Sequence, residues 1–377
     1  MEIDSKIHEI KDDPYKPAKE WKERTWGKVV GYFCSYAPEE IIYASGALPV
    51  RIIGRNKAAT LSGAHLQNYC CSLARTSLDM ALEGDFDFLD GTVFVHTCDT
   101  MQRLSDIWRL NAGAGAHFDV VLPTFLGGKN AYEYLRSELS SFKKSFENEF
   151  GKISDDDLRR SIDVYNRNRQ LLEELYSLRI DRPEVLSSEK LYMIVTSSSL
   201  MEKNEHNKLL ESLLSELKAS SSSGDSGGGK SVARIFGIGS VMEEWDFLRI
   251  LKEAGGTFVD DDFCNGRRYF DGLIQQTDDP IEGIARRISE RAICPCKHTN
   301  TYARADDILE RVMDSRAEGV IFFQFKFCEP HAFDYVALKE ALDKASIPSM
   351  LIEIEQGSVS LEQLRTRIEA FIETIRG

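Results

Sequence analysis

The sequence predicts an α/β protein with two Rossmann-like (flavodoxin-like) lobes of parallel sheet, joined by a helical connector. Short apolar runs typical of buried strands alternate with helical patterns in residues 26–128, and again in residues 231–377. Residues 129–218 instead carry long helical patterns. The Ser- and Gly-rich stretch 219–230 is typical of a flexible linker between the connector and the second lobe.

Each element follows from its local pattern. Residues 1–25 form a polar helical lead-in, with a short helix around Lys19. In the first lobe we expect strands at 27–33, 47–53, 91–96 and 118–122, and helices near 38–45, 63–83 and 100–111. In the connector, apolar residues recur at three- and four-residue steps over 133–150 and 154–178. In the second lobe we expect strands at 232–237, 256–260, 319–325 and 349–353, and helices near 241–254, 281–291, 304–316, 333–345 and 360–375.

The composition narrows the possible locations and partners. The chain has 377 residues and a formal net charge of −14, which disfavours nucleic acid as a partner. Residues 1–14 lack the apolar core of a signal peptide, and no apolar run is long enough to cross a bilayer. We therefore expect a cytoplasmic protein with no membrane partner. Structural disulfides are rare in that compartment, so its eight cysteines are core residues, metal ligands or redox groups.

Three cysteines each stand just past a predicted strand. Cys34 follows the run 29–33, Cys98 follows 93–97, and Cys328 follows 320–327. Ligands of an open parallel sheet collect beyond the carboxyl ends of its strands, so these thiolates could converge on one soft metal centre, most commonly an iron–sulfur cluster. Three ligands would leave one iron of a cubane open to substrate, water or sulfide. For each cysteine alone, packing in the core is the alternative interpretation.

Residues beside these cysteines are candidates for the chemistry. Ser35 and Glu39 begin the helix that follows Cys34, where we expect them near the carbonyl group of a substrate. Glu329 and His331 follow Cys328 closely in the sequence and are the nearest candidates for proton transfer.

The remaining cysteines carry weaker signals. Cys264 is a fourth cysteine after a predicted strand and lines the same crevice in this interpretation. Cys70 and Cys71 lie inside a helical pattern, so we interpret them as mostly structural. Cys294 and Cys296 have neither the C-x-x-C spacing nor a second cysteine pair, and they receive the same interpretation.

The stretches of sequence around these cysteines resemble the 2-hydroxyacyl-CoA dehydratase and benzoyl-CoA reductase (ATP-dependent, class I) subunit family. The resemblance runs from about residue 15 to the end, and its strongest stretches are 31–52, 86–110, 255–270, 326–335 and 363–371. It implies one [4Fe-4S] cluster per chain, held by Cys34, Cys98 and Cys328.

The resemblance also implies partners. Family members work with a homologous second subunit and with a separate ATP-hydrolysing iron–sulfur activator, which takes electrons from a donor such as ferredoxin under anaerobic conditions. ATP would bind only to the activator, and this agrees with the lack of a P-loop motif here. The substrate would be an acyl-CoA.

Two chemistries fit this resemblance. Stretches 62–73 and 102–111 are closer to the benzoyl-CoA reductase type, which dearomatises an aromatic acyl-CoA through a ketyl-type radical. The alternative is the radical dehydration of a 2-hydroxyacyl-CoA. Two further possibilities are a non-catalytic, cluster-bearing electron-transfer subunit and a homodimer with a larger double-cubane cluster, for which Cys264 would be an extra ligand.

Overall fold

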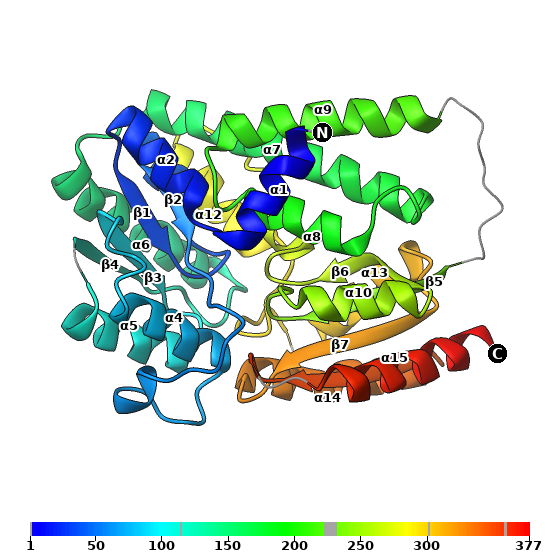
Figure 1. The fold of residues 1–377 in the computed structure, drawn as a ribbon. Helices are drawn as coiled ribbons and strands as arrows, with labels where there is room; N and C mark the ends of the chain where they lie inside the picture. The colour runs from blue at the N-terminus through cyan, green and yellow to red at the C-terminus, as the bar shows by residue number, and fades with distance from the viewer. Residues whose placement is uncertain (1, 114, 222–231, 301, 358–359) are drawn as a thin grey trace.

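Two four-stranded parallel sheets form the framework of the computed structural model, which describes residues 2–113, 115–221, 232–300, 302–357 and 360–377 (Figure 1). The first sheet has the order β2-β1-β3-β4, and its strands are β1 (Val29–Tyr32), β2 (Leu48–Arg51), β3 (Gly91–Val95) and β4 (Ala116–Val120). The second has the order β6-β5-β7-β8, with β5 (Ala233–Gly239), β6 (Gly256–Asp262), β7 (Gly319–Phe325) and β8 (Ser349–Ile354). The predicted fold class is confirmed, and a strand lies at each of the eight expected places.

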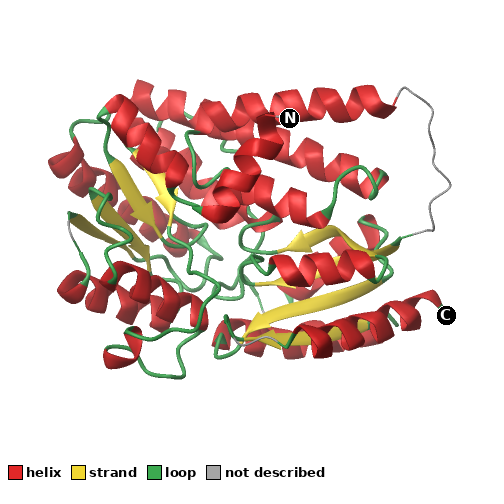
Figure 2. Ribbon diagram, viewed as in Figure 1, coloured by secondary structure: helices red, strands yellow, loops and turns green. Residues whose placement is uncertain are grey.

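The two sheets have the same strand order when each is numbered from its own first strand. In both, the order reverses between the first and third strands, which is the point where open α/β sheets bind ligands. The carboxyl ends of both sheets face the region between the lobes (Figure 2). Loops that follow these strands therefore meet there.

Helices cover both faces of the first sheet and shield its apolar strands from water. On one face, the apolar core joins β1, β3 and β4 to α3 (Glu39–Ala44), α6 (Lys129–Phe150) and α12 (Pro280–Glu290). On the other face it joins the sheet to α2 (Lys16–Thr25), α4 (Ser72–Leu82) and α5 (Asp99–Asn111). The short helix expected around Lys19 is α2.

The two halves of the chain are interleaved at α12. This helix comes from the second half of the sequence, yet its Ile281, Ile284 and Ile288 are buried in the core of the first lobe. They pack there with α6, whose Leu139 and Phe142 are also buried. The first lobe therefore needs residues from beyond position 280 to complete its core.

The second sheet is also covered on both faces. One face packs against α8 (Ser188–Ser197), α10 (Trp245–Glu253) and α15 (Leu361–Arg376). The other packs against α13 (Ala303–Asp314) and α14 (Glu329–Lys344). Three short helical elements lie outside these layers: α1 (Glu2–Asp12), η1 (Ser62–Ala64) and α11 (Arg267–Phe270).

Long helices of the middle region run across both lobes. α7 (Asp155–Asp181) contacts α3 of the first lobe and β6 of the second, and it packs along α9 (Lys203–Ser221) at the top of the view (Figure 1). A capping box fixes its start, because Ser154 Oγ accepts from the Asp157 N–H and the Asp157 carboxylate accepts from the Ser154 N–H. Of the predicted linker, 219–221 end α9, and 222–230 lie outside the described residues.

The helix expected over 63–83 is shorter than predicted. α4 begins at Ser72, and η1 and a turn precede it. The Asp79 carboxylate on α4 accepts from the backbone N–H groups of Leu61 and Ser62 at 3.1 and 2.6 Å. These bonds fold the segment before α4 back onto the helix, so the chain cannot continue as one helix. Cys71 consequently lies at the start of α4 instead of inside it.

None of the helices in the described part of the chain combines the length and apolar character that crossing a bilayer requires.

Candidate active site

Three cysteines occupy equivalent positions in this structure. Cys71, Cys98 and Cys328 are the N-cap residues of α4, α5 and α14, and we call them the cap cysteines. At each, burial raises the pKa of the thiol, and the backbone N–H three residues further on opposes that shift because it favours the thiolate. A helix N-terminus stabilises negative charge, so three such ends are directed at three sulfur atoms.

The three sulfurs also lie near one another. Cys98 and Cys328 each interact electrostatically with Cys71, and Cys328 interacts with Cys98. Cys71 packs against the apolar cores of both lobes, sharing one core with Cys98 and the other with Cys328. The structure therefore brings together two of the three predicted ligands, with Cys71 as the third member of the set.

Burial dominates the chemistry of these thiols. It raises the pKa of Cys98 to about 12 and that of Cys328 well above its usual range, against the opposing effect of the helix N–H groups. Buried thiols directed at helix N-termini fit a bound cation, because a metal takes the place of the protons. The donor set therefore fits an iron–sulfur cluster.

A cluster and a single ion require different spacings of their ligands. Among the described residues, no three Cys, His, Asp or Glu side chains are placed closely enough to hold one metal ion. In a cubane each thiolate binds a different iron, so its ligands stand farther apart than the ligands of a mononuclear centre.

Cys34 lies in a different environment. Its backbone has a positive φ of 74°, and the neighbouring Cys264, which follows β6 of the other lobe, together with burial raises the pKa of the Cys34 thiol well above its usual range. Arg51 Nη2 donates to Cys264 Sγ, at 2.9 Å. Cys34 thus neighbours Cys264 across the lobe boundary, and it also interacts electrostatically with Cys294.

His331 forms a hydrogen bond with one of the three cap cysteines. Its Nδ1 atom lies 3.3 Å from Cys328 Sγ, and its Nε2 lies 3.3 Å from Arg268 Nη2. Because arginine only donates, Nε2 is an acceptor and Nδ1–H is the donor to sulfur. Burial, together with Arg268 and Arg304, lowers the pKa of His331 to about 3, so the ring is neutral.

Ser35 and Glu39 are both buried away from open space. The Ser35 Oγ and carbonyl oxygen accept from Arg291 at 2.8 and 2.6 Å. Glu39 accepts from the hydroxyl groups of Tyr32 and Tyr269 at 2.8 and 3.1 Å, with Lys203 Nζ 3.9 Å away. The prediction placed both residues near a substrate carbonyl, but in the structure their polar atoms are occupied by protein groups.

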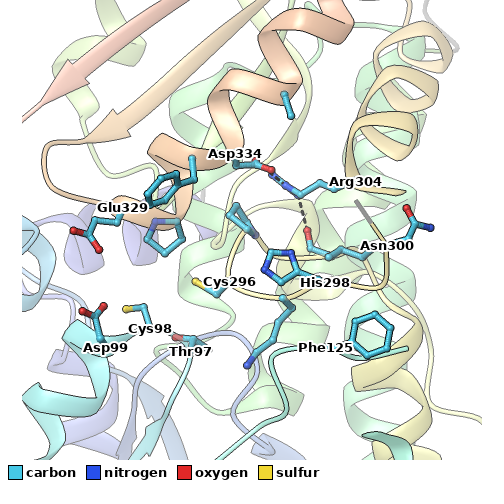
Figure 3. Close-up of a pocket in the computed structure, with 16 residues that line it drawn as sticks. Thr97, Cys98, Asp99, Phe125, Cys296, His298, Asn300, Arg304, Glu329 and Asp334 are labelled. Atoms are coloured by element: carbon cyan, nitrogen blue, oxygen red, sulfur yellow. Dashed lines mark hydrogen bonds and ion pairs between the residues drawn. The ribbon is translucent and has the colours of Figure 1, made fainter. Parts of the chain in front are cut away.

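A cavity of about 730 Å³ opens between the lobes, and of the cap cysteines Cys98 lines it. Figure 3 shows Cys98, Asp99 and Glu329 at one end and Phe125 and Asn300 at the other, with Cys296 between them. The remaining residues that line it are Thr97, Ile293, Pro295, Lys297, His298, Arg304, Pro330, Phe333, Asp334 and Ala337. Of the predicted proton-transfer candidates, Glu329 lines this cavity, whereas His331 is not among its lining residues.

A buried ion-pair network fixes the wall formed by the second lobe. Arg304 donates to Asp334 at 2.8 Å and to the fully buried Asp262, which also faces Arg268. Arg268 in turn contacts His331 and the sulfur of Cys294. The network therefore links α13, α14 and β6 to the residues around the sulfurs.

Sequence reasoning missed Cys71 and Cys296. The signal for Cys71 was its place directly before a helical apolar pattern, as with Cys98 and Cys328. For Cys296 the sequence held no such signal, because its loop reaches the cavity only through the packing of α12 on the first lobe.

Comparison with known proteins places these features in a family. Residues 34–375 match the model of the 2-hydroxyglutaryl-CoA dehydratase, D-component, family. The chain is 28% identical to the (R)-phenyllactyl-CoA dehydratase beta subunit of Clostridium sporogenes, over 97% of each chain. It is also 28% identical to a subunit of the benzoyl-CoA reductase of Thauera aromatica, over 97% of this chain and 95% of that one. Identity to the (R)-2-hydroxyglutaryl-CoA dehydratase beta subunit of Acidaminococcus fermentans is 27%, over 92% of each. The match to the family model spans most of the chain, so the protein belongs to the 2-hydroxyglutaryl-CoA dehydratase D-component family of acyl-CoA dehydratase and reductase subunits.

Proposed function

We propose that this protein is the iron–sulfur subunit of a low-potential benzoyl-CoA reductase, which dearomatises an aromatic acyl-CoA with electrons from an ATP-hydrolysing activator. The observation that carries the proposal is the set of cap cysteines, Cys71, Cys98 and Cys328, of which Cys98 lines the inter-lobe cavity. These three residues would hold one [4Fe-4S] cluster, with Cys71 in place of Cys34. When bound, the cluster supplies single electrons at low potential to the thioester carbonyl.

The cavity provides the other requirements of the reaction. Phe125 and Phe333 are 53% and 80% exposed on its wall, and they offer flat apolar surfaces to an aromatic acyl group. Two carboxylates also line the cavity: Asp99 directly follows Cys98 in the sequence, and Glu329 directly follows Cys328. Reduction of a ring consumes protons as well as electrons, so a carboxyl group at this end would hold and release a proton at the substrate.

A second candidate is the radical dehydration of a 2-hydroxyacyl-CoA. It is favoured by the names of the relatives from Clostridium sporogenes and Acidaminococcus fermentans, which are dehydratase subunits. The phenyl group in the first of those names is compatible with the same aromatic walls. Both reactions would use the same cluster and the same cavity, and both would need a homologous partner subunit.

The ligand assignment is tested by the iron content of cysteine variants. We expect Cys71→Ser, Cys98→Ser and Cys328→Ser, purified without oxygen, each to lose the cluster beside the cavity and its spectroscopic signal. Cys70→Ser is the matched control, because Cys70 neighbours Cys71 but packs in the apolar core. Equal iron in Cys71→Ser and Cys70→Ser would refute the assignment.

The reaction is tested with the complete enzyme. The protein, its partner subunit and the activator would be assayed anaerobically with ATP and a reductant, separately on benzoyl-CoA and on 2-hydroxyacyl-CoA substrates. Formation of a cyclic diene from benzoyl-CoA supports the reductase. An enoyl-CoA formed only from the hydroxy substrates would establish the dehydratase instead.

A further inference from the structure

Lys297 is a buried lysine in the lining of the cavity between the lobes. It belongs to the connection between α12 and α13, and only 2% of its surface is exposed. Its Nζ atom donates one hydrogen bond, to the carbonyl oxygen of Leu122 at 3.3 Å, and has no carboxylate partner among the described residues. An ammonium group carries three N–H donors, so this one has capacity for a further acceptor.

The arginine in the same lining is neutralised by the protein, in contrast to Lys297. Arg304 donates to Asp334 at 2.8 Å and also to Asp262, so two carboxylates balance its charge. A buried cation without such a partner costs free energy unless an anion or a polar acceptor meets it. The charge of Lys297 is therefore available to a ligand of the cavity.

Backbone hydrogen bonds fix the segment that carries Lys297 to the first lobe. The His298 N–H donates to the Thr124 carbonyl at 2.9 Å, and the Leu126 N–H donates to the His298 carbonyl at 2.7 Å. The bond from Nζ to Leu122 ties the side chain to the same stretch after β4. A charge held in place beforehand needs no reorganisation during a reaction, which is the requirement for stabilising charge that develops on a substrate.

The stretch that holds Lys297 runs beside the loop of Cys98. β3 and β4 are paired up to Val95 and Val120, and neighbouring strands are about 4.8 Å apart. The chain beyond β3, with Cys98, and the chain beyond β4, with Leu122, therefore leave the sheet next to each other. Lys297 and Cys98 both line the cavity that these segments reach.

We propose that Lys297 binds the thioester oxygen of the acyl-CoA and stabilises the negative charge that this oxygen acquires when the thioester accepts an electron. The inference rests on the proposed function for the identity of the substrate and of the donor, an iron–sulfur centre of low potential. The donor loses one electron, the thioester gains it, and no bond is formed or broken. Because a charge shielded from water acts more strongly than one in solution, the ammonium group makes the thioester a better electron acceptor.

An acyl-CoA also carries phosphate groups, which are a second source of anionic oxygen. A diphosphate bears several negative charges, whereas Lys297 supplies one positive charge and Arg304 is already paired. A single buried ammonium group beside the Cys98 loop matches the single charge that develops on the thioester oxygen. The experiment distinguishes the two sources.

The carbonyl group of the bound substrate reports this contact directly. The protein and its partner subunit, without reductant, would bind benzoyl-CoA or a 2-hydroxyacyl-CoA labelled with carbon-13 at the thioester carbonyl, for infrared difference spectroscopy. We expect the carbonyl band of the wild type to shift to lower frequency than in free substrate, because the ammonium group polarises the bond. Lys297→Met should lose this shift at unchanged iron content, and Lys297→Arg should keep part of it.

Turnover with the activator, ATP and a reductant is the second readout. In Lys297→Met we expect kcat to fall about 100-fold or more, while the dissociation constant of the acyl-CoA changes less than about threefold. Lys344→Met, at a side chain that is 74% exposed on α14, is the matched control. If Lys297→Met fails to fold by circular dichroism, Lys297→Gln replaces it, because its amide keeps a donor for Leu122.

Every other outcome decides against the inference. A carbonyl band and a kcat at wild-type values in Lys297→Met would overturn it and leave the proposed function intact. Weaker binding of both acyl-CoA and coenzyme A alone, with unchanged kcat, would assign Lys297 to a phosphate. A lower thermal midpoint with normal turnover would leave it a structural role. Absence of acyl-CoA binding in the wild-type complex would instead refute the proposed function, and the inference with it.

Discussion

The Nδ1 atom of His331 lies 3.3 Å from the sulfur of Cys328, and its N–H donates a hydrogen bond to that sulfur. The opposite nitrogen accepts from Arg268, which fixes the tautomer. A residue that the sequence suggested for proton transfer is therefore placed to act on Cys328, which we propose as a cluster ligand. Hydrogen bonds to sulfur stabilise the reduced, more negative state of a cluster and so raise its potential.

Removal of this hydrogen bond is predicted to lower the midpoint potential. In His331→Ala we expect a fall of about 20–60 mV, the equivalent of one hydrogen bond for a one-electron couple, with unchanged iron content. A redox titration followed by electron paramagnetic resonance measures it. His331→Asn, which keeps an N–H donor, should recover part of the shift. A wild-type potential in His331→Ala would contradict the role.

Replacement of the cavity carboxyl group is predicted to slow turnover without loss of iron. Glu329→Gln keeps the shape of the side chain but cannot exchange a proton, so we expect turnover to fall about 100-fold or more. Glu340→Gln, on the exposed side of the same helix, is the control. Equal turnover in the two variants at equal iron content would exclude Glu329 as the proton donor.

Glu39 is predicted to matter for stability and not for catalysis. Glu39→Gln removes the negative charge that faces Lys203 and weakens the bonds from Tyr32 and Tyr269. We expect a loss of about 2 kcal/mol in the free energy of unfolding, visible as a lower thermal midpoint, and normal turnover of the folded, iron-loaded enzyme. Glu362→Gln, on the surface of α15, should change neither. Slow turnover in folded Glu39→Gln would restore the catalytic interpretation.

A pH effect is predicted at Glu243. Burial raises its pKa to about 8, and its Oε1 atom has no hydrogen-bond partner among the described residues. The folded state thus binds a proton more tightly than the unfolded state, so this group costs stability progressively as the pH rises from about 4.5 to about 8. Glu243→Gln should therefore be more stable than the wild type by about 1–3 kcal/mol at pH 8, with little difference at pH 4.5.

The measurement at Glu243 is thermal unfolding across that pH range. Glu253→Gln is the control, since Glu253 is exposed and paired with Arg365 on the surface. A stability difference between Glu243→Gln and the wild type that does not grow with pH would contradict the burial argument.

The sheets were predictable because each buried parallel strand is a short apolar run between helical patterns, as β3 and β7 illustrate. The meeting of Cys98 and Cys328 was predictable for a related reason, since each follows a strand whose carboxyl end faces the other lobe. Their role as iron ligands stays a prediction.

Cys71 and Cys34 show where the pattern was insufficient. The apolar repeat that suggested a helix over 63–83 could not reveal the bonds from Asp79 that start α4 at Ser72. Cys34 satisfies the same strand-end rule as Cys98, but its backbone has a positive φ, and its thiol neighbours Cys264 of the other lobe. Local pattern places a residue along the chain, whereas long-range packing decides which neighbour its side chain meets.

The crossing of α12 onto the first lobe affects the order in which the protein can be made. A nascent chain that has emerged only as far as residue 221 carries all of the first sheet, but the part of α6 that packs against α12 lacks its cover. That part remains exposed to water until the ribosome has added roughly the next seventy residues. The N-terminal half is consequently a poor candidate for expression alone, and the site at the lobe boundary is assembled late in synthesis.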